Sequence, residues 1–78
     1  MKTYNGHKNW AHWNVSLWIN NDEGLYNAAL TAIRHNDTRK QAAEYLLSML
    51  SDSGVTQTPD GARYSVTTIR AAMSGMAP

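Results

Sequence analysis

The stretch of sequence that decides the fold reads Trp10-Ala11-His12-Trp13-Asn14-Val15-Ser16-Leu17-Trp18-Ile19-Asn20-Asn21-Asp22. It holds all three tryptophans of the 78-residue chain. At about 100° per residue, the apolar side chains of residues 10–19 cover more than half of a helical circumference, and only His12 and Ser16 lie opposite. A helix that is apolar over so wide an arc is typically the central helix of its domain. We therefore predict a core helix over residues 10–19, capped by Asn9 after a turn at Asn5-Gly6.

The tryptophans have two possible roles, as core residues or as interface anchors. A domain of this size has difficulty burying three indoles completely, so we expect at least one to keep an accessible edge and to serve as a natural anchor for a partner. Core packing is the commoner role of such residues. The core or anchor residues are Trp10, Trp13 and Trp18.

Asn14 lies inside the apolar arc of this helix, between Trp10 and Trp18. A buried amide without hydrogen bonds costs about 1 to 3 kcal/mol. The sequence therefore predicts a polar partner for Asn14, and we expect it to tie the helix to a nearby segment of the chain.

Three further helices are expected, over residues 22–35, 39–51 and 59–75. Asn20 or Asn21 would cap the first of these, and Thr38 with Gln41 fits a capping box before the second. Thr58-Pro59-Asp60 is typical of a helix start with proline at the first helical position. Against the last helix stands the β-branched run at residues 66–69, which leaves a hairpin around Pro59-Asp60-Gly61 as the alternative.

Four short helical segments with brief connections predict an all-α bundle, with a short strand at Lys2–Tyr4 as the only β element considered. The length suits one domain over residues 1–78. A hydrophobic fraction of 42% and a charged fraction of 17% are typical of a globular chain, and without cysteine no disulfide framework stabilises it. We expect packing alone to supply the stability.

The charge balance excludes strong electrostatic targeting. Seven Lys and Arg residues against six Asp and Glu residues give a net charge of +1, too small to direct the molecule to nucleic acid or anionic lipid. No apolar run approaches the roughly 20 residues of a membrane span, and the N-terminus does not read as a signal peptide. These patterns predict a cytoplasmic protein.

The sequence gives no sign of an enzyme, a cofactor or a metal site. The histidines His7, His12 and His35 lack metal-ligand spacing, and no nucleophile motif or phosphate-binding glycine loop occurs. Helix caps, helix dipoles or surface pairs account for the six carboxylates. We therefore predict no catalytic residues, no cofactor and no metal ligand.

Two basic surfaces are candidates for contacts. If residues 59–75 are helical, Arg63, Thr67 and Arg70 share one flank, which suits a phosphate or an acidic protein as well as a merely solubilising face. Lys2 and Lys8, with Tyr4 and the tryptophans, would form a second basic and aromatic surface.

The segment from Tyr4 to Tyr26 resembles a family of small bacteriophage proteins. The shared pattern is Asn-Gly, Asn, Trp, an aliphatic-rich stretch, Leu-Trp and Asn-Asp, and the matching residues are Asn5-Gly6, Asn9, Trp13, Val15, Leu17-Trp18 and Asn21-Asp22. His7 departs from the aromatic residue expected at its position. The chain is similar to anti-CRISPR proteins that act on type I-C systems.

This resemblance implies a phage inhibitor that binds a protein subunit of the host RNA-guided surveillance complex and blocks its engagement of target DNA. An inhibitor that imitates DNA would need its acids on one surface, and the acids in question are Asp22, Glu23, Asp37, Glu44 and Asp52. The alternatives are a nucleic-acid-binding phage regulator using Arg63, Arg70, Lys2 and Lys8, and a phage accessory protein of structural role. The oligomeric state stays open.

Overall fold

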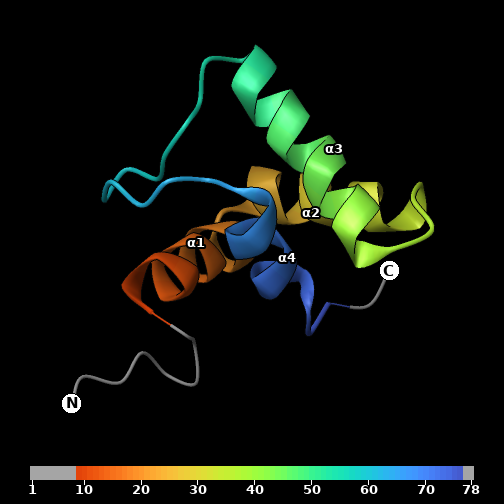
Figure 1. The fold of residues 1–78 in the computed structure, drawn as a ribbon, viewed down its shortest axis with the longest axis horizontal. Helices are drawn as coiled ribbons and strands as arrows, with labels where there is room; N and C mark the ends of the chain where they lie inside the picture. The colour runs from red at the N-terminus through yellow and green to blue at the C-terminus, as the bar shows by residue number, and fades with distance from the viewer. Residues whose placement is uncertain (1–8, 77–78) are drawn as a thin grey trace.

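A computed structural model describes residues 9–76 of the protein, which fold into four α-helices (Figure 1). The helices are α1 (Trp10–Asn21), α2 (Glu23–Arg34), α3 (Arg39–Asp52) and α4 (Val66–Met73). This arrangement confirms the predicted all-α class. The strand considered at Lys2–Tyr4 and the turn at Asn5-Gly6 lie outside the described residues.

Short polar side chains begin each helix. Asn9 caps α1 by accepting a hydrogen bond from the backbone N–H of His12 at 3.0 Å. Asp22 ends α1 and caps α2, and Thr38 caps α3. These caps satisfy backbone donors that the first helical turn leaves free. They explain why the first three predicted helices begin within one residue of their expected starts.

The four helices pack around one apolar cluster. α4 lies between α1 and α3, and α2 covers the other side of the same pair (Figure 1). The largest fully buried apolar side chains come from α1, α3 and α4, and they are Val15, Ile19, Leu46, Ile69 and Met73. Alanines on α2 and α3 contribute to the core, and their small side chains allow neighbouring helices to approach closely.

Residues 59–65 are not helical, which corrects the expected start of the last helix. Ser65 caps α4, and Ser65 and Thr68 form a complete capping box. This capping box is a stronger signal for a helix start than Thr58-Pro59-Asp60, and it lies within the helix that was expected over residues 59–75. The β-branched residues that argued against the longer helix lie within α4, where Thr68 serves the cap and Ile69 the core.

The segment before α4 instead folds back on itself, as the alternative hairpin proposed. The backbone N–H of Thr58 donates to the carbonyl of Ala62 at 2.8 Å, and the N–H of Gly61 donates to the carbonyl of Thr58 at 2.9 Å. One antiparallel bridge joins Gln57 to Arg63. Gly61 has a φ of +97°, the left-handed conformation typical of a three-residue hairpin loop. We call residues 58–62 the Pro59 turn.

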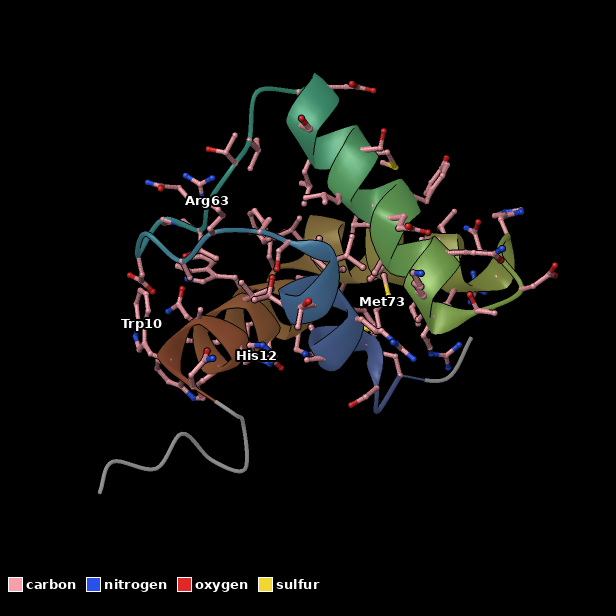
Figure 2. The ribbon with its side chains drawn as sticks, in the orientation of Figure 1. Trp10, His12, Arg63 and Met73 are labelled. Carbon is pink, nitrogen blue, oxygen red and sulfur yellow. The ribbon has the colours of Figure 1, made fainter. Side chains whose placement is uncertain are left out.

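The tryptophans are not among the buried core residues, although core packing is the commoner role of such residues. The buried residues of α1 are Asn14, Val15 and Ile19. Trp13 and Trp18 are half-buried and Trp10 is 39% exposed, so the expectation of at least one accessible indole is confirmed. Figure 2 shows Trp10 at the outer end of α1, away from the central Met73. Val15 and Ile19 instead belong to the same buried cluster as alanines of the other helices, whose small side chains allow the helices to approach closely.

Within residues 9–76, none of the helices combines the length and the apolar character needed to cross a bilayer.

Candidate interaction surfaces

Asn14 has the polar partner that its position required. Its side-chain Nδ2 donates to Oδ2 of Asp60 at 2.9 Å, and its Oδ1 accepts from the hydroxyl of Thr58 at 2.6 Å. Asp60 Oδ2 also accepts from the indole Nε1 of Trp18 at 2.9 Å. Two residues of α1 thus hold the Pro59 turn, and in the described part of the chain every fully buried side-chain nitrogen or oxygen has a partner.

The network sets the ionisation of Asp60. Hydrogen bonds from Asn14 and then from Trp18 lower the pKa of Asp60 from its ordinary 3.8, against a smaller opposing effect of desolvation. Both donors favour the ionised carboxylate because they donate to its oxygen. The turn is therefore held to α1 by a carboxylate that is charged at neutral pH.

One face of α1 carries an exposed apolar strip, which we call the Trp10–Leu17 strip. The strip begins at Trp10 and continues with Trp13 and Leu17, which follow it by three and seven residues, so the three side chains lie along one side of the helix. Leu17 is 37% exposed, close to the exposure of Trp10, and Trp13 is half-buried. No Asp, Glu, Lys or Arg occurs in α1. Large apolar side chains on an uncharged surface are typical of protein-binding sites.

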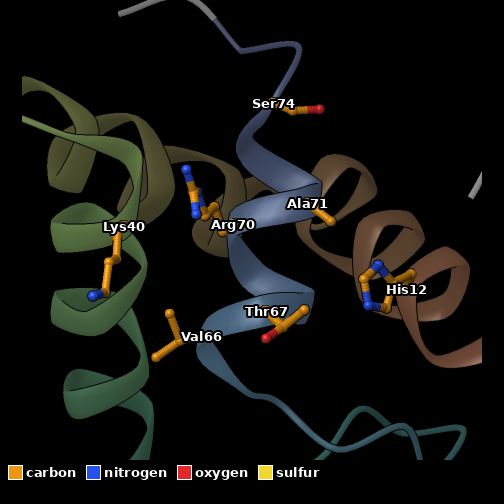
Figure 3. Close-up of a pocket in the computed structure, with 7 residues that line it drawn as sticks. All are labelled: His12, Lys40, Val66, Thr67, Arg70, Ala71 and Ser74. Carbon is orange, nitrogen blue, oxygen red and sulfur yellow. The ribbon is translucent and has the colours of Figure 1, made fainter. Parts of the chain in front are cut away.

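A shallow basic groove crosses α4. It has a volume of about 460 Å³ and is lined by His12, Lys40, Val66, Thr67, Arg70, Ala71 and Ser74. Figure 3 shows α4 in the middle of this groove, with Lys40 of α3 on one side and His12 of α1 on the other. The lining includes no carboxylate. Its chemistry suits an anion, because two cations and two hydroxyls line one depression.

The structure separates the residues that sequence analysis placed on one basic flank. Thr67 and Arg70 lie on α4 and line the groove, whereas Arg63 lies beyond the Pro59 turn and pairs with Gln57. The predicted three-residue flank was wrong because Arg63 is not helical. Lys40 and His12 take part instead, and only tertiary packing brings them beside α4. Lys2 and Lys8 lie outside the described residues.

The acids do not gather into one compact cluster. Asp22 and Glu23 begin α2, and Asp37 follows its end. A helix of this length separates its ends by about 18 Å, at about 1.5 Å per residue. Glu44 lies in the middle of α3 and Asp52 at its last residue. These five acids are therefore distributed over α2 with its cap, α3 and the turn between them.

A second depression, which we call the aromatic cavity, has a volume of about 520 Å³. It lies where the segment after α3 passes the junction of α1 and α2, and its lining includes Trp18, Asp22, Leu25, Val55, Pro59 and Tyr64. Desolvation, and then the charge of Asp22, raise the pKa of Tyr64. This cavity was not predictable from the sequence, because no regular spacing in the chain relates Tyr64 to Asp22.

Residues 1–77 match the family described as "Family of unknown function (DUF7249)". No curated protein and no solved structure gives a significant match. Because the match spans nearly the whole chain, the protein belongs to this family of unknown function.

Proposed function

We propose that this protein is a non-enzymatic phage inhibitor that binds a protein subunit of the host type I surveillance complex and blocks engagement of target DNA. The observation that carries the proposal is the Trp10–Leu17 strip. Exposed tryptophan is enriched among the residues that dominate binding energy at protein interfaces. The inhibitor would act in the cytoplasm of the bacterial host, without a cofactor, and with no catalytic step.

The position of the strip within the phage-type motif supports this function. Several motif residues have clear structural tasks, because Asn9 and Asp22 cap helices and Val15 lies in the core. Trp18 fastens the Pro59 turn through Asp60. Leu17 is exposed instead, and Trp13 lies half-buried beside it. The motif thus provides both a stable helix and the apolar side chains that project from it.

The charge distribution favours contact with protein over imitation of DNA. The strip itself is uncharged, and the carboxylates are spread over α2 with its cap, α3, the turn between them and the Pro59 turn. A partner surface of matching chemistry would be apolar with a polar rim. We therefore place the inhibitor on a protein face that the complex needs for DNA engagement, rather than in its phosphate-binding channel.

The test is target-DNA binding by a purified type I-C surveillance complex, measured by gel shift with increasing amounts of inhibitor. Wild-type protein should prevent the shift, and the double variant Trp10→Ala/Leu17→Ala should need at least about tenfold more protein, as loss of central anchors does. The matched control is Tyr45→Ala/Met49→Ala on α3, whose side chains are 48% and 42% exposed. The control should inhibit like wild type.

Three results would contradict the proposal. They are no inhibition by wild-type protein, equal loss in both double variants, and full inhibition by the α1 variant. Thermal unfolding of each variant by circular dichroism shows whether it is folded. A folded wild-type chain that binds neither the complex nor nucleic acid would point to a structural role.

The second candidate function is nucleic-acid binding, which the basic groove favours. Lys40 and Arg70 line this groove together with the hydroxyls of Thr67 and Ser74, and no carboxylate is part of the lining. Binding to DNA or RNA without any host protein, weakening steeply with salt, would support this function. The double variant Lys40→Ala/Arg70→Ala should then lose its binding to DNA or RNA. The control is Arg34→Ala, which removes an exposed arginine at the end of α2 and should change this binding little.

A further inference from the structure

The aromatic cavity has an unusual combination of lining groups. Trp18 and Tyr64 provide aromatic surface, and Leu25, Val55 and Pro59 add apolar surface. Asp22 is its one charged residue, and no Lys, Arg or His is part of the lining. Asp60 adds a second carboxylate nearby, since it is bonded to the Trp18 indole. The walls of the cavity are therefore mostly apolar, and the two carboxylates give it a negative electrostatic potential.

These properties restrict the chemistry of an occupant. An anion would be repelled by Asp22, whereas a neutral apolar group would cover the apolar wall but gain nothing from the charge of this carboxylate, which also caps α2. A cation with an apolar stem satisfies both features, because its charge pairs with Asp22 while its stem covers the apolar wall. Asp22 and Tyr64 line the same cavity, so the negative charge lies beside the aromatic lining; after desolvation, this charge also contributes to the raised pKa of Tyr64.

We propose that the aromatic cavity binds an arginine side chain presented by a partner protein. The guanidinium is planar, stacks on aromatic faces and pairs with carboxylates, and it is more weakly hydrated than an ammonium group. Its stem would lie along Leu25, Val55 and Pro59. The site shares no residue with the Trp10–Leu17 strip, and it goes beyond the proposed function because it does not depend on the identity of the partner.

The experiment is an NMR titration of the ¹⁵N-labelled full chain with acetyl-Gly-Arg-Gly-amide. We expect saturable shifts at Leu25, Val55 and the Trp18 indole N–H. The same peptide with citrulline, a neutral isostere of arginine, should cause no saturable shift. A lysine peptide should bind about threefold more weakly, because its ammonium is compact and more strongly hydrated.

Asp22→Asn is the decisive variant. Asparagine caps a helix about as well as aspartate, so α2 should stay folded while the charge is removed. We expect a loss of affinity for the arginine peptide of about threefold to fivefold, as for a partly exposed ion pair. The matched control is Glu23→Gln, which removes the neighbouring carboxylate of the first turn of α2 but does not change the cavity lining.

Gln57→Glu tests the same site by gain of affinity. Gln57 lines the cavity, and its bridge to Arg63 is a backbone pairing that the substitution leaves intact. A second carboxylate should tighten arginine binding about twofold to threefold. This variant keeps the test decisive even if Asp22→Asn unfolds.

Several outcomes would overturn the proposal. They are equal binding of the citrulline peptide, equal or tighter binding of the lysine peptide, unchanged affinity in a folded Asp22→Asn variant, and shifts that map to the basic groove. None of them bears on inhibition of the surveillance complex. Failure of this site and failure of the proposed function are thus distinguishable.

Discussion

The side-chain amide of Asn14 donates a hydrogen bond of 2.9 Å to the carboxylate of Asp60, which lies 46 residues further along the chain. Asn14 is 1% exposed, whereas Asp60 lies at the surface. The bond therefore joins the interior of α1 to an exposed turn. The same bond positions one wall of the aromatic cavity, because Thr58 and Pro59 of this turn line the cavity.

Replacing Asn14 should destabilise the protein. Asn14→Ala removes the acceptor of the Thr58 hydroxyl and the donor to Asp60, and we expect a loss of about 1 to 3 kcal/mol in the free energy of unfolding. Urea denaturation followed by circular dichroism measures the loss. Asn27→Ala, at an exposed position of α2, should change the stability by less than about 0.5 kcal/mol.

A double-mutant cycle with Asp60→Ala separates this bond from other effects. If the two side chains stabilise each other, the double variant should lose less stability than the two single variants added together. Strict additivity would mean that the bond contributes nothing.

Acid should weaken the attachment of the turn. The pKa of Asp60 is lowered from 3.8 in the folded protein, so folding favours its ionised form. This stabilisation is fully present above the unfolded-state pKa and is lost as the pH falls through the lower folded-state pKa. Between about pH 5 and pH 2.5, the urea midpoint of the wild type should therefore fall further than that of Asp60→Asn, which does not titrate.

The two proteins differ only at residue 60, so the difference between their pH profiles reports the Asp60 carboxylate. Parallel profiles would show that its pKa is the same in the folded and unfolded chain.

Gly61 should be intolerant of a side chain for a conformational reason. Its φ is +97°, and a Cβ built there meets no atom within 4 Å. The cost of Gly61→Ala is thus backbone strain without a steric clash, and we expect about 1 to 2 kcal/mol from thermal or urea unfolding. Gly75→Ala also places its Cβ in open space but without a positive φ. An equal loss in both variants would contradict this explanation.

Trp10 should be the indole most accessible to quenchers. With 39% of its surface exposed and the other two tryptophans half-buried, acrylamide should quench a distinct part of the emission. Trp10→Phe should remove much of this quenchable part and shift the remaining emission to shorter wavelength. Emission from the wild type that is wholly blue-shifted and protected from acrylamide would contradict the exposed strip.

Local sequence determined most of the helices. Asn9 and Thr38 cap helical turns through contacts three residues apart, so their effects were predictable from spacing alone. At α2 the cap is Asp22 and not the expected Asn20 or Asn21, because α1 continues through Asn21. The need of Asn14 for a partner was predictable as well, since burial of a bare amide is costly wherever it occurs. The identity of that partner was not, because Thr58 and Asp60 are distant in sequence.

Competition between local signals explains the error at the last helix. Thr58-Pro59-Asp60 fits a helix start, but it also fits a turn, and the turn gains two hydrogen bonds from α1 that no local pattern contains. Ser65 with Thr68 then supplies a complete cap for α4. Long-range hydrogen bonds thus favoured the turn over the longer helix. Because Arg63 is therefore not helical, the predicted basic flank of Arg63, Thr67 and Arg70 does not form.

The sequence by itself determined that the chain is helical, where three of its helices begin, and that one polar residue of α1 would need a distant partner, because these follow from short-range hydrogen bonding and periodic burial. Tertiary structure alone decided which side of the tryptophan-rich helix faces inward. An apolar arc wider than the space available must leave some of its members outside, and the alanine-rich surfaces of the facing helices accommodate Val15 and Ile19 in place of the larger indoles.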